Sequence, residues 1–199
     1  MSYGQKPFSE LTDEELIAAF QHSSEEAFEV LVGRFKNPLT NFVYRFVGDY
    51  DECDDIVQET FVRVFRNKHS YTPQAKFSTW IYTIASNLAK SRLRQRERHR
   101  LVSLLLPGQK EGEEKESEIP DLRYAADRNA DSALKHERIQ KALNAISAKY
   151  REVVVLRDIQ ELSYEEIAKI TGLNLGTVKS RIKRGRTMLQ ALLRDIFEE

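Results

Sequence analysis

Apolar residues along the chain recur at intervals of three and four positions and seldom alternate, a spacing that predicts helices throughout. Several predicted helices begin with a hydroxyl residue and a Glu three positions later, the pattern of a capping box: Thr12 with Glu15, Ser23 with Glu26 and Ser163 with Glu166. The expected helices cover residues 12–21, 24–47, 51–67, 78–100, 131–146, 148–158, 163–170 and 174–195. This pattern indicates an all-α fold.

The helical pattern stops between the fourth and fifth helices. Residues 106–121, LPGQKEGEEKESEIPD, contain two prolines, two glycines and many acids, with almost no large apolar residue to bury. We therefore expect two small helical domains, residues 10–100 and 131–195, joined by an acidic flexible linker over residues 101–130. The apolar run LVSLLLP before the break has two interpretations: a helix end packed on the first domain, which we favour, or a segment that binds a partner.

Composition restricts the cellular setting. The single cysteine, Cys53, excludes an intramolecular disulfide and a CxxC metal site, and it is typical of a reducing cytoplasm. No signal-peptide pattern opens the sequence, and no apolar run approaches the roughly 20 residues of a membrane span. We expect a cytoplasmic protein that needs no metal and no cofactor. Cys53 stands in an acidic helix start, which disfavours its thiolate, so we expect it to be unreactive.

The formal net charge of zero hides a strong segregation of charge. Residues 90–100 hold six Lys or Arg against one Glu, and residues 179–186 hold five cations and no acid. Between them, residues 111–127 hold seven acids against two bases. Two basic segments therefore flank an acidic connector, which favours contacts with nucleic acid at two places.

The second basic segment belongs to a predicted helix-turn-helix. Residues 163–186, SYEEIAKITGLNLGTVKSRIKRGR, read as a short capped helix, a turn at residues 171–173 and a longer helix. Gly172 supplies the permissive backbone that a tight turn needs, and Ala168 is small enough for the second helix to cross closely.

The longer helix has two different faces. At 100° per residue one stripe holds Val178, Ile182, Gly185 and Leu189. The opposite face holds Thr177, Ser180 and Arg184, with Lys179, Arg181 and Lys183 on the shoulders. An apolar back and a front of Arg and hydroxyl groups suit a recognition helix in a DNA major groove, where Arg reads guanine and Lys holds phosphates. A solvated basic face is the simpler interpretation, which the agreement of turn, core spacing and charge disfavours.

In the first half, residues 51–67 have an apolar stripe at Ile56, Val57, Phe61, Val64 and Phe65. The outer face then holds Asp54, Asp55, Gln58, Glu59 and Arg63. Asp55 and Glu59 also have the spacing of a carboxylate metal site in a helical hydrolase. No His-containing motif accompanies them, and acids in a first helical turn ordinarily interact with the helix dipole.

Residues 71–100 form a Pro-containing loop and an aromatic helix that becomes basic. Phe77, Trp80, Tyr82, Asn87, Lys90 and Arg94 are typical of surfaces that bind single-stranded nucleic acid. Trp80 and Ile84 share one helical face, so we expect both in the core. For Lys90, Arg92, Arg94 and Arg96 an electrostatic role is favoured.

Four features, in their order along the chain, resemble a known family. They are DDIVQETFVRVF, FSTWIYTIASNLAKSRLR, an acidic linker and KYREVVVLRDIQELSYEEIAKITGLNLGTVKSRIKRGR. Over about residues 10–195 the chain is similar to sigma factors of bacterial RNA polymerase, of the short two-domain extracytoplasmic-function group. The resemblance implies a region 2 helical bundle at 10–100 and a region 4 helix-turn-helix at 131–195. It also implies a non-catalytic, promoter-specificity subunit that serves a stress or envelope response.

In that family, region 2 docks on the clamp helices of the beta-prime subunit. The resemblance assigns this contact to Asp54, Asp55, Gln58, Glu59 and Arg63. Region 2 also melts and reads the minus-ten element. The resemblance assigns the loop at residues 70–77 to the capture of a flipped base, and contacts with the melted strand to Lys76, Phe77, Asn87, Lys90 and Arg94.

Region 4 of the family grips the minus-thirty-five element as duplex, a role that falls here on Thr177, Lys179, Ser180, Arg181 and Arg184. The implied partners are core polymerase, through the clamp helices and the beta flap, promoter DNA and an anti-sigma factor. The connector of the family threads toward the active centre, whereas a plain tether explains the composition of this long linker equally well.

Two other classes remain open at this point. A stand-alone helix-turn-helix regulator predicts a sequence-specific shift of naked promoter duplex without polymerase. A helical metal hydrolase with a DNA-binding tail predicts metal-dependent turnover that Asp55→Ala abolishes, whereas in a sigma factor the same change weakens core binding.

Overall fold

The computed structural model describes residues 7–105 and 130–197, and within them the protein is all-α. The N-terminal unit contains α1 (Asp13–Gln21), α2 (Glu25–Val47), α3 (Tyr50–Arg66) and α4 (Phe77–Leu105). The C-terminal unit contains α5 (Ala130–Ala145), α6 (Ala148–Val154), α7 (Tyr164–Thr171) and α8 (Leu175–Phe197). The predicted all-α class is confirmed, and each predicted helix is present within a few residues of its expected ends, except that α4 runs on to Leu105.

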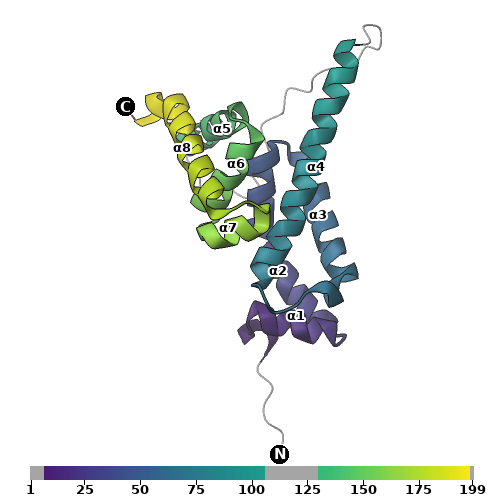
Figure 1. Ribbon diagram of the computed structural model, residues 1–199. Helices are drawn as coiled ribbons and strands as arrows, with labels where there is room; N and C mark the ends of the chain where they lie inside the picture. Colours follow the sequence, from purple (N-terminus) through teal and green to yellow (C-terminus); the bar gives the residue numbers. More distant parts are fainter. Residues whose placement is uncertain (1–6, 106–129, 198–199) are drawn as a thin grey trace, which may run out of the picture.

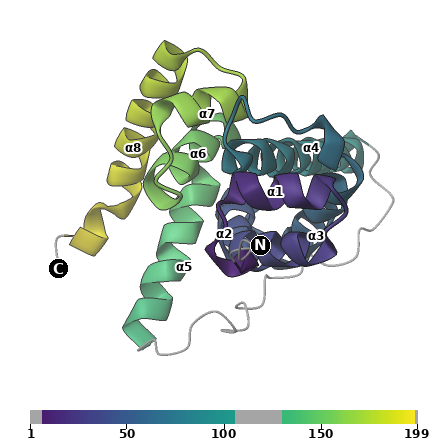
Figure 2. The same cartoon turned by 90° about the horizontal axis from the view of Figure 1, so that it is seen from below.

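The N-terminal unit is a bundle in which α2, α3 and α4 lie side by side and α1 crosses one end (Figures 1 and 2). Its core consists of large side chains that are fully buried, among them Leu16, Leu39, Phe42 and Ile81. The apolar stripe of α3 faces this core at Ile56, Val57 and Val64. Phe65, which the sequence placed on the same stripe, is 47% exposed, and its ring packs against Phe20 at the edge of the bundle.

Local chemistry sets the ends of the helices. The capping boxes of Thr12 with Glu15 and of Ser163 with Glu166 are both present. The predicted box at Ser23 is wrong, because the tight turn after α1 places Ser23 at φ 76°. Ser24 caps α2 instead, and its side chain accepts from the Ala27 N–H at 3.4 Å.

The apolar run before the linker continues α4 as helix. There α4 extends past α2 and α3 (Figure 1), so that Leu101 and Val102 remain 59% and 54% exposed. Packing of these two residues on the N-terminal unit, which we had favoured, is therefore wrong. The rest of the predicted linker, residues 106–129, lies outside the described residues.

The C-terminal unit packs α6, α7 and α8 around Leu156, Ile167 and Ile182. Between α6 and α7 the backbone forms a π-helical turn, Val155–Ile159, where the sequence predicted plain helix. Gly172 adopts φ 69°, as the predicted turn between α7 and α8 requires. Gly185 lets α8 approach α6, because a Cβ there would stand 2.6 Å from Val154 Cγ2.

The two units pack against each other. The α7 helix lies beside α4, while α5 and α6 lie against α2 (Figures 1 and 2). Asn144 of α5 covers Gly48, at the end of α2, so closely that a Cβ on Gly48 would stand 2.4 Å from Asn144 Oδ1. Buried polar groups also cross this boundary, and several of them involve residues that the sequence assigned to DNA.

Candidate nucleic-acid interface

The α8 helix presents the two faces that the sequence predicted. Val178, Ile182 and Gly185 are buried against the rest of the C-terminal unit. Lys179, Ser180 and Arg184 are exposed, and Thr177 and Arg181 are partly exposed. Asn174 caps the helix, its side-chain oxygen accepting from the Thr177 N–H at 2.8 Å. The structure therefore brings the five predicted duplex contacts together on one accessible side of a helix.

Neighbouring groups hold two of the α8 cations. The Arg184 guanidinium hydrogen-bonds the Tyr150 hydroxyl and lowers its pKa. Arg186 forms an ion pair with Asp158, which raises the pKa of Arg186. Arg186 therefore helps to fix α8 on the π-helical turn, and the five cations of residues 179–186 do not share one role.

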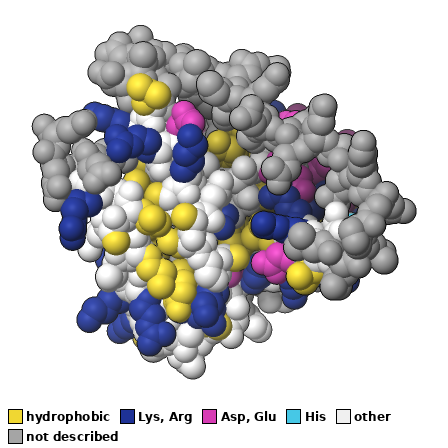
Figure 3. Space-filling view, turned by 90° about the horizontal axis from the view of Figure 1, so that it is seen from above, with side chains coloured by type: hydrophobic (Ala, Val, Ile, Leu, Met, Phe, Trp, Pro, Cys, Tyr) yellow, Lys and Arg dark blue, Asp and Glu magenta, His cyan; other side chains and the backbone are white. Residues whose placement is uncertain are grey.

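From above, the molecule shows Lys and Arg side chains around an apolar strip, with few acids among them (Figure 3). On α8 the exposed large apolar side chains are Leu175, Met188 and Leu192. A surface of cations and apolar groups with few acids suits phosphate contacts, since acids close to a phosphate would repel it.

The predicted melted-strand surface lies on α4 and the loop before it, but Phe77 is not part of this surface. Its side chain is fully buried, and its ring contacts Phe35, Tyr71 and Trp80. The reason is that Phe77 opens α4 four residues before Ile81 and so lies on the core face of the helix. Trp80 and Ile84, expected in the core, are partly buried against it.

The other predicted strand residues reach the surface. Asn87 and Arg94 are exposed, and Lys90 is partly exposed. The ammonium of Lys90 lies 3.2 Å from Glu152 Oε1, and that of Lys76 lies 2.8 Å from Glu166 Oε1. Both acids come from the C-terminal unit. No sequence pattern indicated Glu152 or Glu166 as partners, because they are 62 and 90 positions away and share no helix with the lysines.

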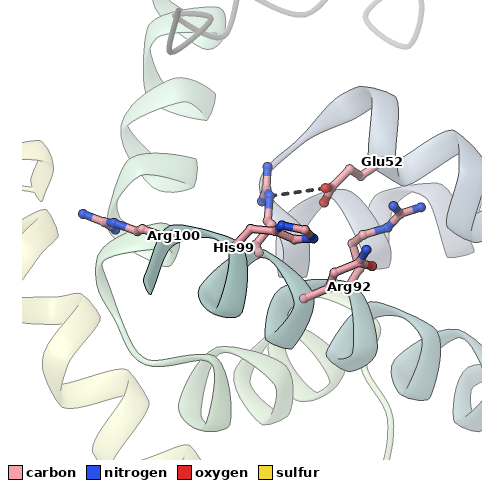
Figure 4. A pocket seen from close by; sticks show the side chains of 6 residues that line it. Glu52, Arg92, His99 and Arg100 are labelled. Atoms are coloured by element: carbon pink, nitrogen blue, oxygen red, sulfur yellow. Dashed lines mark ion pairs between the residues drawn. The ribbon is translucent and has the colours of Figure 1, made fainter. Parts of the chain in front are cut away.

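Other cations of α4 point toward α3 instead. Arg96 pairs with Asp49 at 2.7 Å and with Glu52 at 3.3 Å, and Arg92 lies 3.6 Å from Asp55. A pocket of about 330 Å³ lies here (Figure 4), lined by Glu52, Arg92, Gln95, Arg96, His99 and Arg100. Burial raises the pKa of Glu52, although Arg96 opposes the shift. Arg92 and Arg96 thus brace α4 on α3, so the basic segment divides into a bracing face and an outer face.

The outer face of α3 carries the predicted polymerase contacts, and all are exposed: Asp54, Asp55, Gln58, Glu59 and Arg63. The two carboxylates of the metal hypothesis each have an arginine partner, Arg92 for Asp55 and Arg63 for Glu59 at 2.8 Å. Over residues 7–105 and 130–197 no three potential metal ligands gather.

Cys53 lies on the inner side of α3. Its side chain is fully buried, and its thiol donates to the Thr40 carbonyl at 3.3 Å. Burial, with the nearby charge of Asp54, raises the pKa of the thiol to about 12. The thiolate is therefore negligible at neutral pH, as the sequence led us to expect.

The chain matches known proteins in both units. The family model of sigma-70 region 2 matches residues 31–99, and that of sigma-70 region 4 matches residues 136–189. The ECF RNA polymerase sigma factor SigW of Bacillus subtilis is 35% identical over 180 residues, covering 90% of this chain and 96% of SigW. The ECF RNA polymerase sigma-E factor of Haemophilus influenzae is 32% identical, covering 94% of this chain and 98% of its own.

Solved structures agree with these matches. CnrH, in complex with the cytosolic domain of CnrY, superposes with a TM-score of 0.67 at 26% identity, covering 92% of this chain and 97% of CnrH. The sigma factor RpoE of Bartonella quintana, in complex with the anti-sigma factor NepR, gives 0.65 at 28% identity over 84% of this chain and 96% of its own. The chain therefore belongs to the ECF sigma factors, promoter-specificity subunits of bacterial RNA polymerase. None of the helices in the described part of the chain combines the length and the apolar character of a membrane span.

Proposed function

We propose that this chain directs initiation through three separate surfaces and supplies no catalytic group of its own. The observation that carries the proposal is the exposed cationic side of α8, held on a capped helix-turn-helix. Residues 131–195 would grip the minus-thirty-five element as duplex, through Thr177, Lys179, Ser180, Arg181 and Arg184. The hydroxyl and guanidinium groups of this side suit base edges, and the lysine suits phosphates.

Residues 10–100 would bind and open the minus-ten element. Asn87 and Arg94, with Lys90 and Lys76 once they are released from Glu152 and Glu166, offer an amide and cations along one side of α4. These groups suit an unstacked strand, because cations follow the backbone and amides bond to bases. Phe77 has no direct part in this contact, since it belongs to the core.

The outer face of α3 would dock on the clamp helices of the polymerase. Its side chains are exposed and polar, and the face is acidic at its start. A face of this kind suits a basic partner surface through electrostatic complementarity. The apolar groups of α8 that remain exposed suit the beta flap. We place the protein in the cytoplasm, where polymerase and chromosome are found.

An anti-sigma factor is the proposed inhibitor of this protein. Of the two solved relatives described above, RpoE is in complex with the anti-sigma factor NepR, and CnrH is in complex with the cytosolic domain of CnrY. The path of the linker between the two DNA-binding units stays a prediction, because residues 106–129 lie outside the described residues.

In-vitro transcription tests the proposal. Purified core polymerase and a pool of genomic fragments are incubated with and without the protein, whose fold is checked by circular dichroism. We expect new start sites only when core and protein are both present, and weak binding of naked promoter duplex without core. Start sites that are the same with and without a folded protein would contradict the proposal. Tight, sequence-specific binding of naked duplex would favour a stand-alone regulator instead.

A further inference from the structure

The first helix of the N-terminal unit, α1, lies across the end of the bundle at which α4 begins (Figure 1). One face of α1 is apolar and buried, at Leu16, Ile17 and Phe20. Glu14 and Gln21 stand seven positions apart on the neighbouring face, so they lie two turns, or about 10 Å, from each other along one side of the helix. This side of α1 meets the loop of residues 71–76 that leads into α4.

The two polar residues of this face bind the two ends of the loop. At its start, the Gln21 amide donates to the Lys68 carbonyl at 2.7 Å and to the Tyr71 carbonyl at 3.0 Å. At its other end, the Phe77 N–H donates to Glu14 Oε1 at 3.0 Å. Phe77 is the first residue of α4, so Glu14 caps this helix from a different element, and its carboxylate also suits the positive end of the helix dipole.

The loop between these anchors has a buried base and an exposed tip. Tyr71 is 6% exposed, and its hydroxyl donates to the Ala75 carbonyl at 2.8 Å, which closes the loop on itself. Burial raises the pKa of that hydroxyl, as do two nearby carboxylates, so it stays protonated and donates. Residues 72–74 form the tip and are all exposed. The tip is thus the part of the loop that a base can reach.

The position of α1 is itself fixed from two sides. Arg34 of α2 donates to Asp13 Oδ1 and to the Ser9 carbonyl, both at 2.8 Å. The Lys68 ammonium, just before the loop, donates to the Phe20 carbonyl near the C-terminal end of α1, also at 2.8 Å. A firmly held α1 therefore ties both ends of the loop to the core of the N-terminal unit.

We propose that Glu14 and Gln21 are positioning residues for promoter melting, which hold the loop of residues 71–76 in the shape that receives a base from the opened strand. They act through the loop and do not contact DNA themselves. The inference rests on the proposed function, because it states how residues 10–100 are prepared to open the minus-ten element. A loop that is already ordered loses less conformational freedom when a base binds, so the two anchors lower the free-energy cost of capture.

The anchors matter at one step of initiation. An extruded base returns to the stack unless a pocket of fitting shape receives it. A loop with one free end samples many shapes, and the apparent affinity for the base falls in proportion to the fraction of receptive shapes. Loss of either anchor should therefore slow opening and leave the earlier binding steps unchanged.

The test measures these steps separately, with reconstituted holoenzyme and a promoter fragment identified in the transcription assay. Affinity for core polymerase is measured by fluorescence anisotropy, binding of unopened duplex by gel shift in the cold, and opening by the permanganate reactivity of thymines over time. Glu14→Ala removes the acceptor of the Phe77 N–H. We expect its opening rate to fall about three- to tenfold, the range that the loss of one helix cap corresponds to, with both affinities unchanged.

Glu14→Gln is the conservative variant. Its amide oxygen can still accept from the Phe77 N–H, so it should restore most of the opening rate. The matched control is Glu29→Ala, which removes the same side chain from an exposed position of α2 and should open the promoter at the wild-type rate. Opening by Glu14→Gln that is as slow as opening by Glu14→Ala would overturn the role of this hydrogen bond.

Gln21→Met tests the other end of the loop. The change keeps the length of the side chain and removes both donors, so we expect a similar fall in the opening rate. Wild-type opening rates for Glu14→Ala and Gln21→Met, both folded by circular dichroism, would overturn the inference. Equal losses in core binding, duplex binding and opening would also overturn it, because they indicate a general loss of structure.

The same measurements tell a failure of this inference from a failure of the proposed function. If wild type opens the promoter with core polymerase and both variants open it equally fast, the positioning role is wrong and the proposed function stands. If wild type gives no start sites with core polymerase, the proposed function is wrong and the inference falls with it.

Discussion

The two cationic helices of this protein differ in what surrounds them. On α8, the exposed cations near the turn face outward, and Arg186 is bound to an acid, Asp158. On α4 and in the loop before it, Lys90 and Lys76 are paired with Glu152 and Glu166, while Arg92 and Arg96 brace α3. A duplex can approach the first surface directly, whereas two lysines of the second are already paired with acids of the C-terminal unit.

A count of charges along the sequence does not distinguish a cation that is exposed from a cation that is paired with an acid. A run of Lys and Arg indicates where phosphates can be bound. Whether a given Lys or Arg is available to a phosphate depends on the acids that the fold brings close to it. For a subunit that meets duplex before melted strand, exposed cations on the duplex surface and paired lysines on the strand surface match the order of events. The predictions that follow alter one surface at a time.

The largest expected effect comes from Arg151→Met, which loosens the contact between the two units. The change removes a buried guanidinium and leaves the carbonyls of Phe46, Asn144 and Ile146 without their donor. We expect the free energy of unfolding to fall by about 3 kcal/mol, measured by urea denaturation. The exposed Arg138, changed to Met, is the control and should alter stability by less than about 0.5 kcal/mol. Similar losses for both variants would contradict the role of Arg151.

Arg184→Ala tests the duplex surface. If Arg184 reads a base bidentately, binding of holoenzyme should weaken by about 1–3 kcal/mol at one promoter position. The measurement is competition between promoter fragments that differ at single base pairs. An equal loss on every sequence would reduce Arg184 to a phosphate contact and leave α8 without its proposed reader.

Gly185→Ala tests how α8 is seated. The new Cβ would meet Val154 at 2.6 Å, so overpacking should exceed the gain in helix propensity, for a net loss of about 1 kcal/mol by thermal unfolding. Gly33→Ala is the matched control, because no atom lies within 4 Å of its new Cβ, and it should stabilise α2 by about 0.5–1 kcal/mol. If both changes stabilise the protein, the claim that α8 needs a glycine at position 185 to approach α6 is wrong.

The smallest expected effect concerns acid. Burial tends to raise the pKa of Glu166, but hydrogen bonds from Lys76 and Ser163 lower it to about 2 from the ordinary 4.5. A carboxyl with a depressed pKa stabilises the folded form above its unfolded pKa, and this contribution is lost as pH falls through the folded value. We expect the ion pair between Lys76 and Glu166 to contribute less to stability as pH falls from about 4.5 toward 2, with no change near neutrality.

Glu166→Gln supplies the comparison for this pH dependence, since Gln can still complete the cap at Ser163. Unfolding curves at a series of pH values should show a shallower acid limb for the variant. Parallel curves for wild type and variant would show that Glu166 is not responsible.

The sequence predicted the elements well, because spacing and capping are local properties. Both capping boxes at Thr12 and Ser163, the turn at Gly172 and the buried stripe of α8 follow from residues a few positions apart. The errors also have local causes. Ser23 sits in a turn of positive φ, and Phe77 looked like a strand contact because an aromatic residue beside cations suits either role.

The contact between the units could not be predicted in this way. The Tyr82 hydroxyl donates to Gln160, which is 78 positions away, and the Ser86 hydroxyl donates to Glu152, which is 66 positions away. Hydrophobic periodicity does not relate residues on opposite sides of a linker that we predicted to be a flexible tether. The sequence also does not distinguish a buried acid from a solvated one. Lys90 was therefore assigned correctly to a basic helix, while its acidic partner was missed.

Energy transfer between two dyes tests the central claim most directly. The dyes are attached at Gln74→Cys, in the loop before α4, and at Lys169→Cys, on α7, both exposed positions. The native Cys53 should not react, because it is buried and the pKa of its thiol is raised to about 12. We predict high transfer in the protein alone and a clear fall when core polymerase is added. Transfer that stays equally high in a holoenzyme that starts transcription would contradict the proposal that Lys76 and Lys90 are released from Glu166 and Glu152 to bind the strand.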